Sequence, residues 1–176
     1  MAVRNAARKS KVLRLEWVYT PTTKAHSMTL KVEVNVTERT PMNPVVTLPF
    51  AGLVATDPTV DVATYDINEM LGTKMRALRQ RDKGRDLFDL AVAWQRSEAG
   101  TTPFRVAPVE CAKAYRFYMA KEGSVATRAD FTNDLRRKAR LQAFRVDLRD
   151  VLAPEAKHDV DTALAIVEEH FLPHLE

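Results

Sequence analysis

The stretch KMRALRQRDKGRDLFDLAV, residues 74–92, contains side chains whose types suit phosphate chemistry. Five of its first ten residues are basic, and Asp86 and Asp89 follow three residues apart at the start of an apolar run. A lysine ammonium binds phosphate oxygens as a point charge, and a carboxylate can bind a divalent metal or accept a proton. Lys74, Asp86 and Asp89 are therefore candidate catalytic residues.

The position of Lys74 on its predicted helix is unusual. At about 100° per residue, helical spacing places Lys74 in one apolar stripe with Ile67, Leu71 and Leu78. An ammonium in such a stripe is costly unless its charged head reaches water or meets an anion. Lys74 therefore either snorkels to solvent or borders a cleft in which it binds an anionic ligand such as a phosphate.

The two aspartates also allow two interpretations. Asp86 follows Gly84, so it could cap a helix by accepting backbone N–H groups, and the helix dipole would favour Asp89 nearby. Alternatively, the short connection between the two predicted helices allows them to pack antiparallel. Lys74 and Asp89 would then lie in one pocket.

A further carboxylate, Glu33, lies on a predicted strand whose opposite face is aliphatic. Glu33 either faces water beside Lys31 or projects toward the same cleft as Lys74. In the second case it would suit a divalent metal that holds triphosphate oxygens. Glu33 is thus a candidate metal ligand.

Hydropathy patterns divide the chain into a β-rich part, residues 1–65, and a helical part, residues 66–176. Alternating apolar residues predict an antiparallel pair of strands over 11–21 and 28–39, with short strands near 44–50 and 60–65. The expected fold class is α+β, a small and mostly antiparallel sheet followed by a helical bundle. Helical spacing predicts helices over 66–80, 85–96, 106–123, 127–141 and 155–175.

Capping residues mark several of these helix ends. Asp66, with Glu69 three residues later, predicts an N-cap and a capping box. Thr127 and Pro154 stand where helices should begin, and Gly123 stands where one should end.

Composition narrows the class of protein. Of the 176 residues, 45% are hydrophobic and 28% charged, and no apolar run approaches the ~20 residues that cross a bilayer. A secretory signal pattern is missing, so a cytoplasmic location is expected. The single cysteine, Cys111, is expected to be a small buried hydrophobe. The net charge is +4, and basic residues cluster at 4–14, 74–85 and 136–149. These clusters form either a polyanion-binding face or solvated arginine surfaces.

Three motifs resemble, in order, the later motifs of the AbiEii/AbiGii nucleotidyltransferase toxin family. They are LKVEV with Glu33, INEMLGTKMRAL with Lys74, and RDLFDL with Asp86 and Asp89, and they cover about residues 28–95. The resemblance implies a polymerase-β-like nucleotidyltransferase, often the toxin half of a bacterial toxin–antitoxin or phage-abortive system. It also implies that Lys74 binds the nucleotide triphosphate, that Asp89 is needed for activity, and that Mg²⁺ and an NTP are used.

The chain departs from this family at the first motif, a Gly-Ser followed by Asp-x-Asp. Residues 1–30 contain neither glycine nor aspartate, although such carboxylates supply most of the metal ligation in two-metal transfer. We expect a truncated nucleotidyltransferase. The alternatives are that a partner supplies the missing carboxylates or that the chain is no longer catalytic.

Two functions follow. The first is a nucleotidyltransferase toxin that transfers a nucleotide from an NTP to an RNA acceptor such as tRNA, and that pairs with a cognate antitoxin. The second is a non-catalytic module that binds nucleic acid or an antitoxin on the same scaffold. In the first, the residues expected at the RNA backbone are Arg79, Arg81, Lys83 and Arg85.

Overall fold

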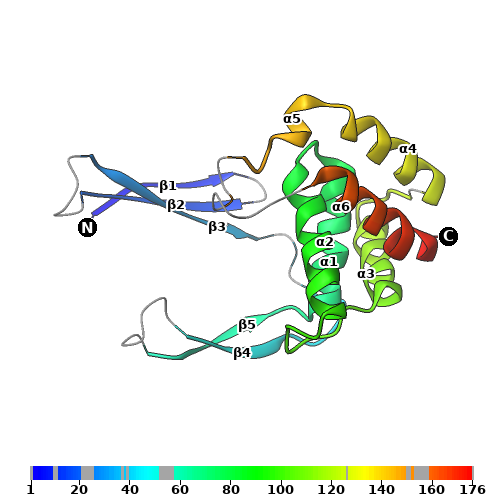
Figure 1. Cartoon of the computed structure of the whole chain (residues 1–176). Helices are drawn as coiled ribbons and strands as arrows, with labels where there is room; N and C mark the ends of the chain where they lie inside the picture. Colours follow the sequence, from blue (N-terminus) through cyan, green and yellow to red (C-terminus); the bar gives the residue numbers. More distant parts are fainter. Residues whose placement is uncertain are drawn as a thin grey trace. The chain divides into compact units, whose positions relative to one another are not determined.

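The computed structural model forms two compact units, Met1–Pro41 and Met42–Glu176. The first unit consists of strands, and the second carries a β-hairpin and the helices (Figure 1). This composition confirms the predicted α+β class. The predicted change from strands to helices after residue 65 falls inside the second unit, because the hairpin belongs with the helices. The structure describes residues 2–9, 12–20, 26–36, 38, 40–51, 58–125, 127–149, 152 and 159–175.

The first unit is an antiparallel sheet in the order β1-β2-β3. Strands β2 (Val12–Tyr19) and β3 (Met28–Asn35) confirm the predicted pair. Strand β1 (Ala2–Lys9) was not predicted, because its basic and small residues lack the alternation that indicates a strand. It forms by pairing with β2, which satisfies the backbone groups of both strands.

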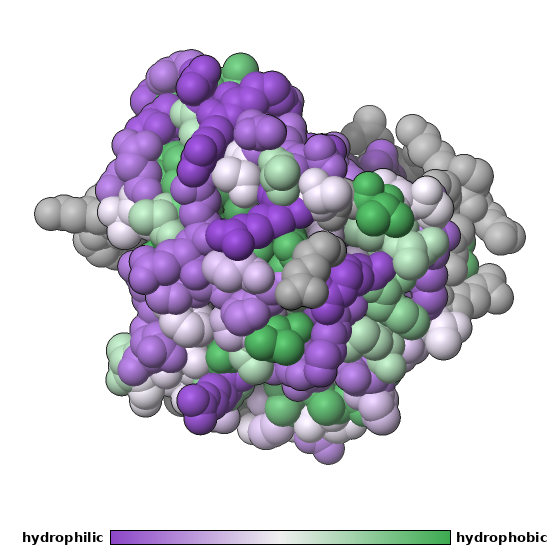
Figure 2. Space-filling model, turned by 90° about the vertical axis from the view of Figure 1, so that its right-hand side faces the viewer, coloured by the Kyte–Doolittle hydropathy of each residue, from purple (hydrophilic) through white to green (hydrophobic). Residues whose placement is uncertain are grey.

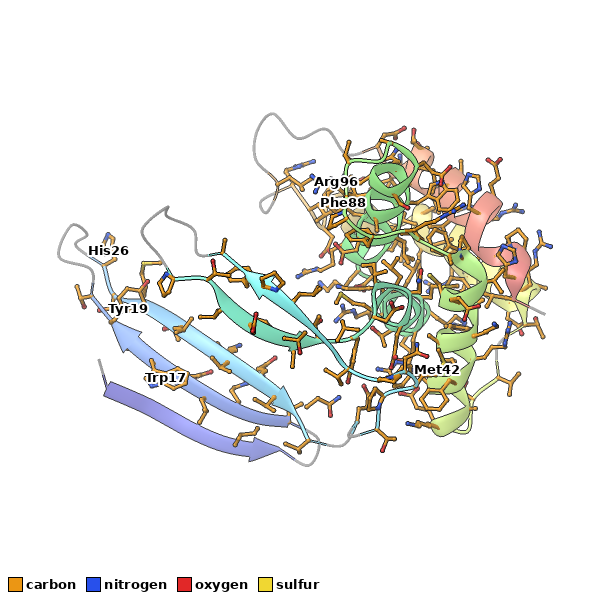
Figure 3. The ribbon with its side chains drawn as sticks, turned by 90° about the horizontal axis from the view of Figure 1, so that it is seen from below. Trp17, Tyr19, His26, Met42, Phe88 and Arg96 are labelled. Carbon is orange, nitrogen blue, oxygen red and sulfur yellow. The ribbon has the colours of Figure 1, made fainter. Side chains whose placement is uncertain are left out.

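Pairing of β2 with β3 sorts their side chains onto two faces. Trp17 lies opposite Leu30, and the neighbouring pairs on that face are also apolar. Figure 3 labels Trp17 on this sheet. The other face carries charged residues, among them Arg14 opposite Glu33. Every residue of β3 is exposed, including the aliphatic side chains on the face opposite Glu33.

The second unit begins with an antiparallel hairpin, β4 (Val46–Phe50) and β5 (Val60–Thr64), which confirms the two predicted short strands. The helices follow. The last predicted helix begins at Val160 and ends in a π turn and a 3₁₀ turn, and Pro154 lies outside the described residues. The bounds are α1 Ile67–Gln80, α2 Gly84–Glu98, α3 Pro108–Lys121, α4 Arg128–Ala139, α5 Gln142–Arg145, α6 Val160–Ile166, η1 Val167–Phe171 and η2 Leu172–His174.

The predicted helix caps are partly confirmed. Asp66 accepts a hydrogen bond from the Asn68 N–H at 2.9 Å, as an N-cap should, and Gly123 has a positive φ of 67° just after α3. Thr127 forms a capping box with Asp130. The capping box expected between Asp66 and Glu69 is wrong, because the Glu69 carboxylate turns inward to other partners.

The buried core lies in the helices of the second unit. α1 contributes Leu71, Met75 and Leu78, and Cys111 on α3 is fully buried, as predicted. Gly72 allows α1 and α3 to approach closely, because a Cβ there would lie 2.5 Å from the Ala114 Cβ.

Among the described residues, none of the helices is long and apolar enough to cross a membrane. The face drawn in Figure 2 is mostly hydrophilic, with small separate hydrophobic patches.

Candidate functional site

Lys74 and the two aspartates come together where α1 faces the first turns of α2. The Lys74 Nζ lies 2.6 Å from the Asp89 Oδ2 and 3.8 Å from the Asp86 Oδ1. The side chains of Lys74 and Asp89 are 34% and 39% exposed, whereas Asp86 is fully buried. The ammonium therefore meets carboxylates at the border of the core, as antiparallel packing of the two helices predicts.

The short link between the helices creates this arrangement. Arg81 ends α1 with an extended backbone, and Gly84 begins α2 two residues after Asp82. Gly84 is required because a Cβ there would collide with the backbone carbonyl of Phe144 on α5. The N-cap of α2 is Lys83, so the interpretation of Asp86 as the N-cap is wrong.

Asp86 lies in the first turn of α2 and binds Arg81. The Arg81 guanidinium donates from Nε to Oδ2 and from Nη2 to Oδ1, each at 2.7 Å. Such two-pronged, charge-assisted bonds are strong and fix the plane of the carboxylate. Hydrogen bonding to Asp86 raises the pKa of Arg81 above its ordinary value. Arg81, which the sequence predicts at an RNA backbone, thus directs two donors to buried Asp86, while its own side chain remains 52% exposed.

Glu69 is a buried carboxylate whose role the sequence did not indicate. It accepts from the Met42 N–H at 2.7 Å, from the Asn43 N–H at 2.8 Å and from the Tyr118 hydroxyl at 2.5 Å. These bonds tie the chain ahead of β4 to α1 and α3, near the label Met42 in Figure 3. Its position three residues after Asp66 also fits a capping box, so the local pattern could not distinguish the two roles.

The remaining cations predicted at RNA also have acidic partners. Asp147, after α5, accepts from the Arg85 Nε at 3.0 Å and lies 3.4 Å from the Lys83 Nζ. The hydrogen bonds from Arg85 hold the pKa of Asp147 at about 2, below its ordinary 3.8. Arg79 lies 3.4 Å from Asp134. Lys83 and Arg85 nevertheless remain about half exposed, at 51% and 48%.

Glu33 belongs to the first unit, where its surroundings explain its charge. The Arg14 guanidinium, across the strand pair, donates from Nε to the Glu33 Oε1 at 2.7 Å. Cross-strand pairs of opposite charge are the ordinary arrangement on a solvated sheet face. A metal-binding role for Glu33 stays a prediction.

Among the described residues, no three histidine, cysteine, aspartate or glutamate side chains are grouped so that they could hold a metal ion. The chain contains one Asp-x-Asp, at Asp159 and Asp161. Asp159 caps α6 through the N–H groups of Asp161 and Thr162, and Asp161 binds Arg145 at 2.7 Å. This pair therefore serves helix capping and an ion pair, and no metal centre is assigned to it.

Lys138 on α4 is a buried cation that the sequence did not single out. Its Nζ donates to the backbone carbonyls of Leu78 at 2.5 Å and Arg79 at 2.9 Å, and pairs with Asp134 at 2.7 Å. These carbonyls belong to the last turn of α1, where backbone carbonyls have no N–H partners within the helix. Lys138 thus holds the end of α1 from which Arg81 reaches Asp86.

Comparison with known families agrees with the motif resemblance. The family model described as "Nucleotidyl transferase AbiEii toxin, Type IV TA system" matches residues 3–166. This match extends well beyond the residues 28–95 that carry the motifs. No curated protein and no solved structure matches the chain.

Proposed function

Because the chain belongs to the AbiEii nucleotidyl transferase toxin family of type IV toxin–antitoxin systems, we propose that it transfers a nucleotide from an NTP to an RNA acceptor. A cognate antitoxin is the partner that this membership implies, and tRNA is the acceptor class we favour. The observation that carries the proposal is the Lys74 ammonium, which lies at the edge of the core between two carboxylates of α2.

Lys74 is the proposed triphosphate ligand. Its ion pair with Asp89 is one-third exposed on each side, so an incoming phosphate can replace the carboxylate at the ammonium without unfolding α1. The compact charge of lysine suits phosphate oxygens, which it binds without a fixed fork geometry. The ion pair with Asp89 thus keeps the Lys74 amine in position before the nucleotide binds.

Asp89, once released, is the proposed proton acceptor. The acceptor hydroxyl oxygen forms a bond to the α-phosphorus of the NTP. The bond between that phosphorus and the oxygen bridging the α- and β-phosphates breaks, and pyrophosphate leaves. The hydroxyl proton passes to the Asp89 carboxylate. Asp86 is buried and paired with Arg81, so its proposed part is to hold negative charge beside Lys74.

Nucleotidyltransferases of this family generally use a divalent metal with the NTP. Mg²⁺ is the ion we expect, but the described residues do not group three ligands, and Glu33 is bound to Arg14. Arg79, Arg81, Lys83 and Arg85 are the proposed contacts to the RNA backbone, and the half-exposed side chains of Arg81, Lys83 and Arg85 suit that role best.

Incorporation of labelled NTP into RNA tests the proposal. We expect Lys74→Ala to lower incorporation at least about a hundredfold, because a phosphate-binding charge is lost. Lys113→Ala is the matched control, since Lys113 is also an ion-paired helix lysine, on α3, and should retain full activity. Incorporation by Lys74→Ala at the control level would remove Lys74 from the reaction.

A second candidate is a non-catalytic module that binds nucleic acid, favoured by the half-exposed cations Lys83 and Arg85. RNA affinity would then fall steeply with added salt and would not depend on NTP. Binding across a salt series, with and without nucleotide, separates the two functions. Affinity that rises with NTP favours the transferase.

A further inference from the structure

The pairing of Arg81 with Asp86 has consequences for Lys74. Asp86 is fully buried, and the Arg81 guanidinium supplies two hydrogen bonds at 2.7 Å. Lys74 is a further cation near it, and its Nζ lies 3.8 Å from the Asp86 Oδ1. A buried carboxylate without a partner carries a large free-energy cost, so it attracts any cation within reach.

Two carboxylates, those of Asp86 and Asp89, lie near the Lys74 ammonium. It binds Asp89 at 2.6 Å, at the exposed side of the pair, and stays beyond hydrogen-bonding distance of Asp86. The geometry explains this preference, because both Asp86 oxygens already accept a charge-assisted bond from Arg81. Without Arg81, the buried carboxylate would draw the lysine inward.

We propose that Arg81 is a positioning residue that satisfies buried Asp86 and thereby keeps the Lys74 amine at the exposed side of the site. The inference rests on the proposed function, in which Lys74 meets the triphosphate. It assigns the Nε and Nη2 donors of Arg81, whose side chain is 52% exposed, to Asp86. Lys138 supports this role, because it anchors the carbonyls of Leu78 and Arg79 just ahead of Arg81.

Chemical labelling of the full chain tests this without relying on catalysis. Acylation of lysines by acetic anhydride, measured by mass spectrometry, reports how accessible each amine is. In Arg81→Gln we expect the Lys74 rate to fall about tenfold relative to wild type, because the amine then bonds to a buried charge. The double variant Arg81→Gln with Asp86→Asn should restore the wild-type rate, and Lys113 serves as the internal reference in every sample.

An unchanged Lys74 rate in folded Arg81→Gln would overturn the proposal, and so would a double variant that stays slow. If circular dichroism shows that Arg81→Gln does not fold, Arg81→Lys decides. A lysine lacks the two-pronged fork and leaves one Asp86 oxygen open to Lys74, so the Lys74 rate should fall, and an unchanged rate contradicts the proposal.

Nucleotide binding gives the functional readout. With ATP as the probe, Arg81→Gln should raise the dissociation constant about tenfold, and the double variant should recover most of the loss. If wild type binds no ATP and incorporates no NTP while the labelling result holds, the proposed function fails and the positioning role of Arg81 stands. If binding is normal and labelling is unchanged, the positioning role fails alone.

Discussion

Asp147 organises the cations of the link between α1 and α2. It accepts from the backbone N–H of Arg85 at 3.2 Å, from the Arg85 Nη2 at 3.1 Å and from the Lys83 Nζ at 3.4 Å. Its side chain is only 7% exposed, so these bonds replace water. One carboxylate thereby fixes two residues proposed at the RNA backbone and the first turn of α2.

The stability contributed by Asp147 should depend on pH. Its pKa falls from 3.8 in the unfolded chain to about 2 in the folded protein, because Arg85 stabilises the charged form. The contribution is therefore complete above about pH 4 and is lost as the pH falls toward 2. Chemical denaturation should show Asp147→Asn destabilised by about 1 kcal/mol at pH 6 and close to wild type near pH 2. An equal deficit at both pH values would contradict this, and exposed Asp82→Asn is the control.

At the scale of elements, the position of α1 decides the site. α1 carries Lys74 and leads into Arg81, while its other contacts are with α3 through Gly72 and with α4 through Lys138. The contact with α3 requires that position 72 carry no side chain, and the contact with α4 requires the buried charge of Lys138. The orientation of Lys74 toward α2 is therefore set by residues that make no direct contact with it.

Gly72→Ala should destabilise the protein by about 1–3 kcal/mol, because the new methyl group would press on the Ala114 Cβ and on the Cys111 carbonyl at 2.7 Å. Urea denaturation measures the loss. Thr73→Ala, on the same turn with a half-buried side chain, should cost clearly less. A Gly72→Ala protein as stable as wild type would mean that α1 and α3 can separate freely.

Lys138→Ala should cost about 3–5 kcal/mol, because it leaves the Asp134 carboxylate and two helix carbonyls without their buried partner. Thermal unfolding provides the measurement. The surface pair variant Lys113→Ala should stay within about 0.5 kcal/mol of wild type. Equal effects of the two substitutions would show that the buried ammonium adds no special stability.

At the scale of the whole molecule, stability is unevenly distributed. The buried hydrophobic residues of the described chain run from Leu71 to Leu175, all in the second unit. Strands β3, β4 and β5 are exposed along almost their whole length. Opening free energies follow burial, so the helices form the stable part of the molecule.

Hydrogen–deuterium exchange measures this distribution. Amides of α1, α2 and α3 should exchange at least about tenfold more slowly than those of β3, because their hydrogen bonds lie over buried side chains. Comparable protection of Met28–Asn35 would show that the aliphatic face of β3 is covered in solution.

Local sequence patterns predicted the α+β class, the β2–β3 pair, the short strands β4 and β5, the start of α1 after Asp66 and the motifs that led to the family. These features depend on local periodicity and capping, which neighbouring residues encode. The patterns did not reveal β1, which forms only by pairing with β2, or the interior roles of Glu69 and Lys138.

Which acid binds which base depends on how the helices pack, and local spacing does not encode that packing. Residues 74–89 offer six bases and three aspartates, and local spacing allows many pairings. Packing of α1 against α2 selected Arg81 for Asp86 and Lys74 for Asp89, because burial makes an unpaired carboxylate costly and a difference of about 1 Å decides whether a hydrogen bond forms.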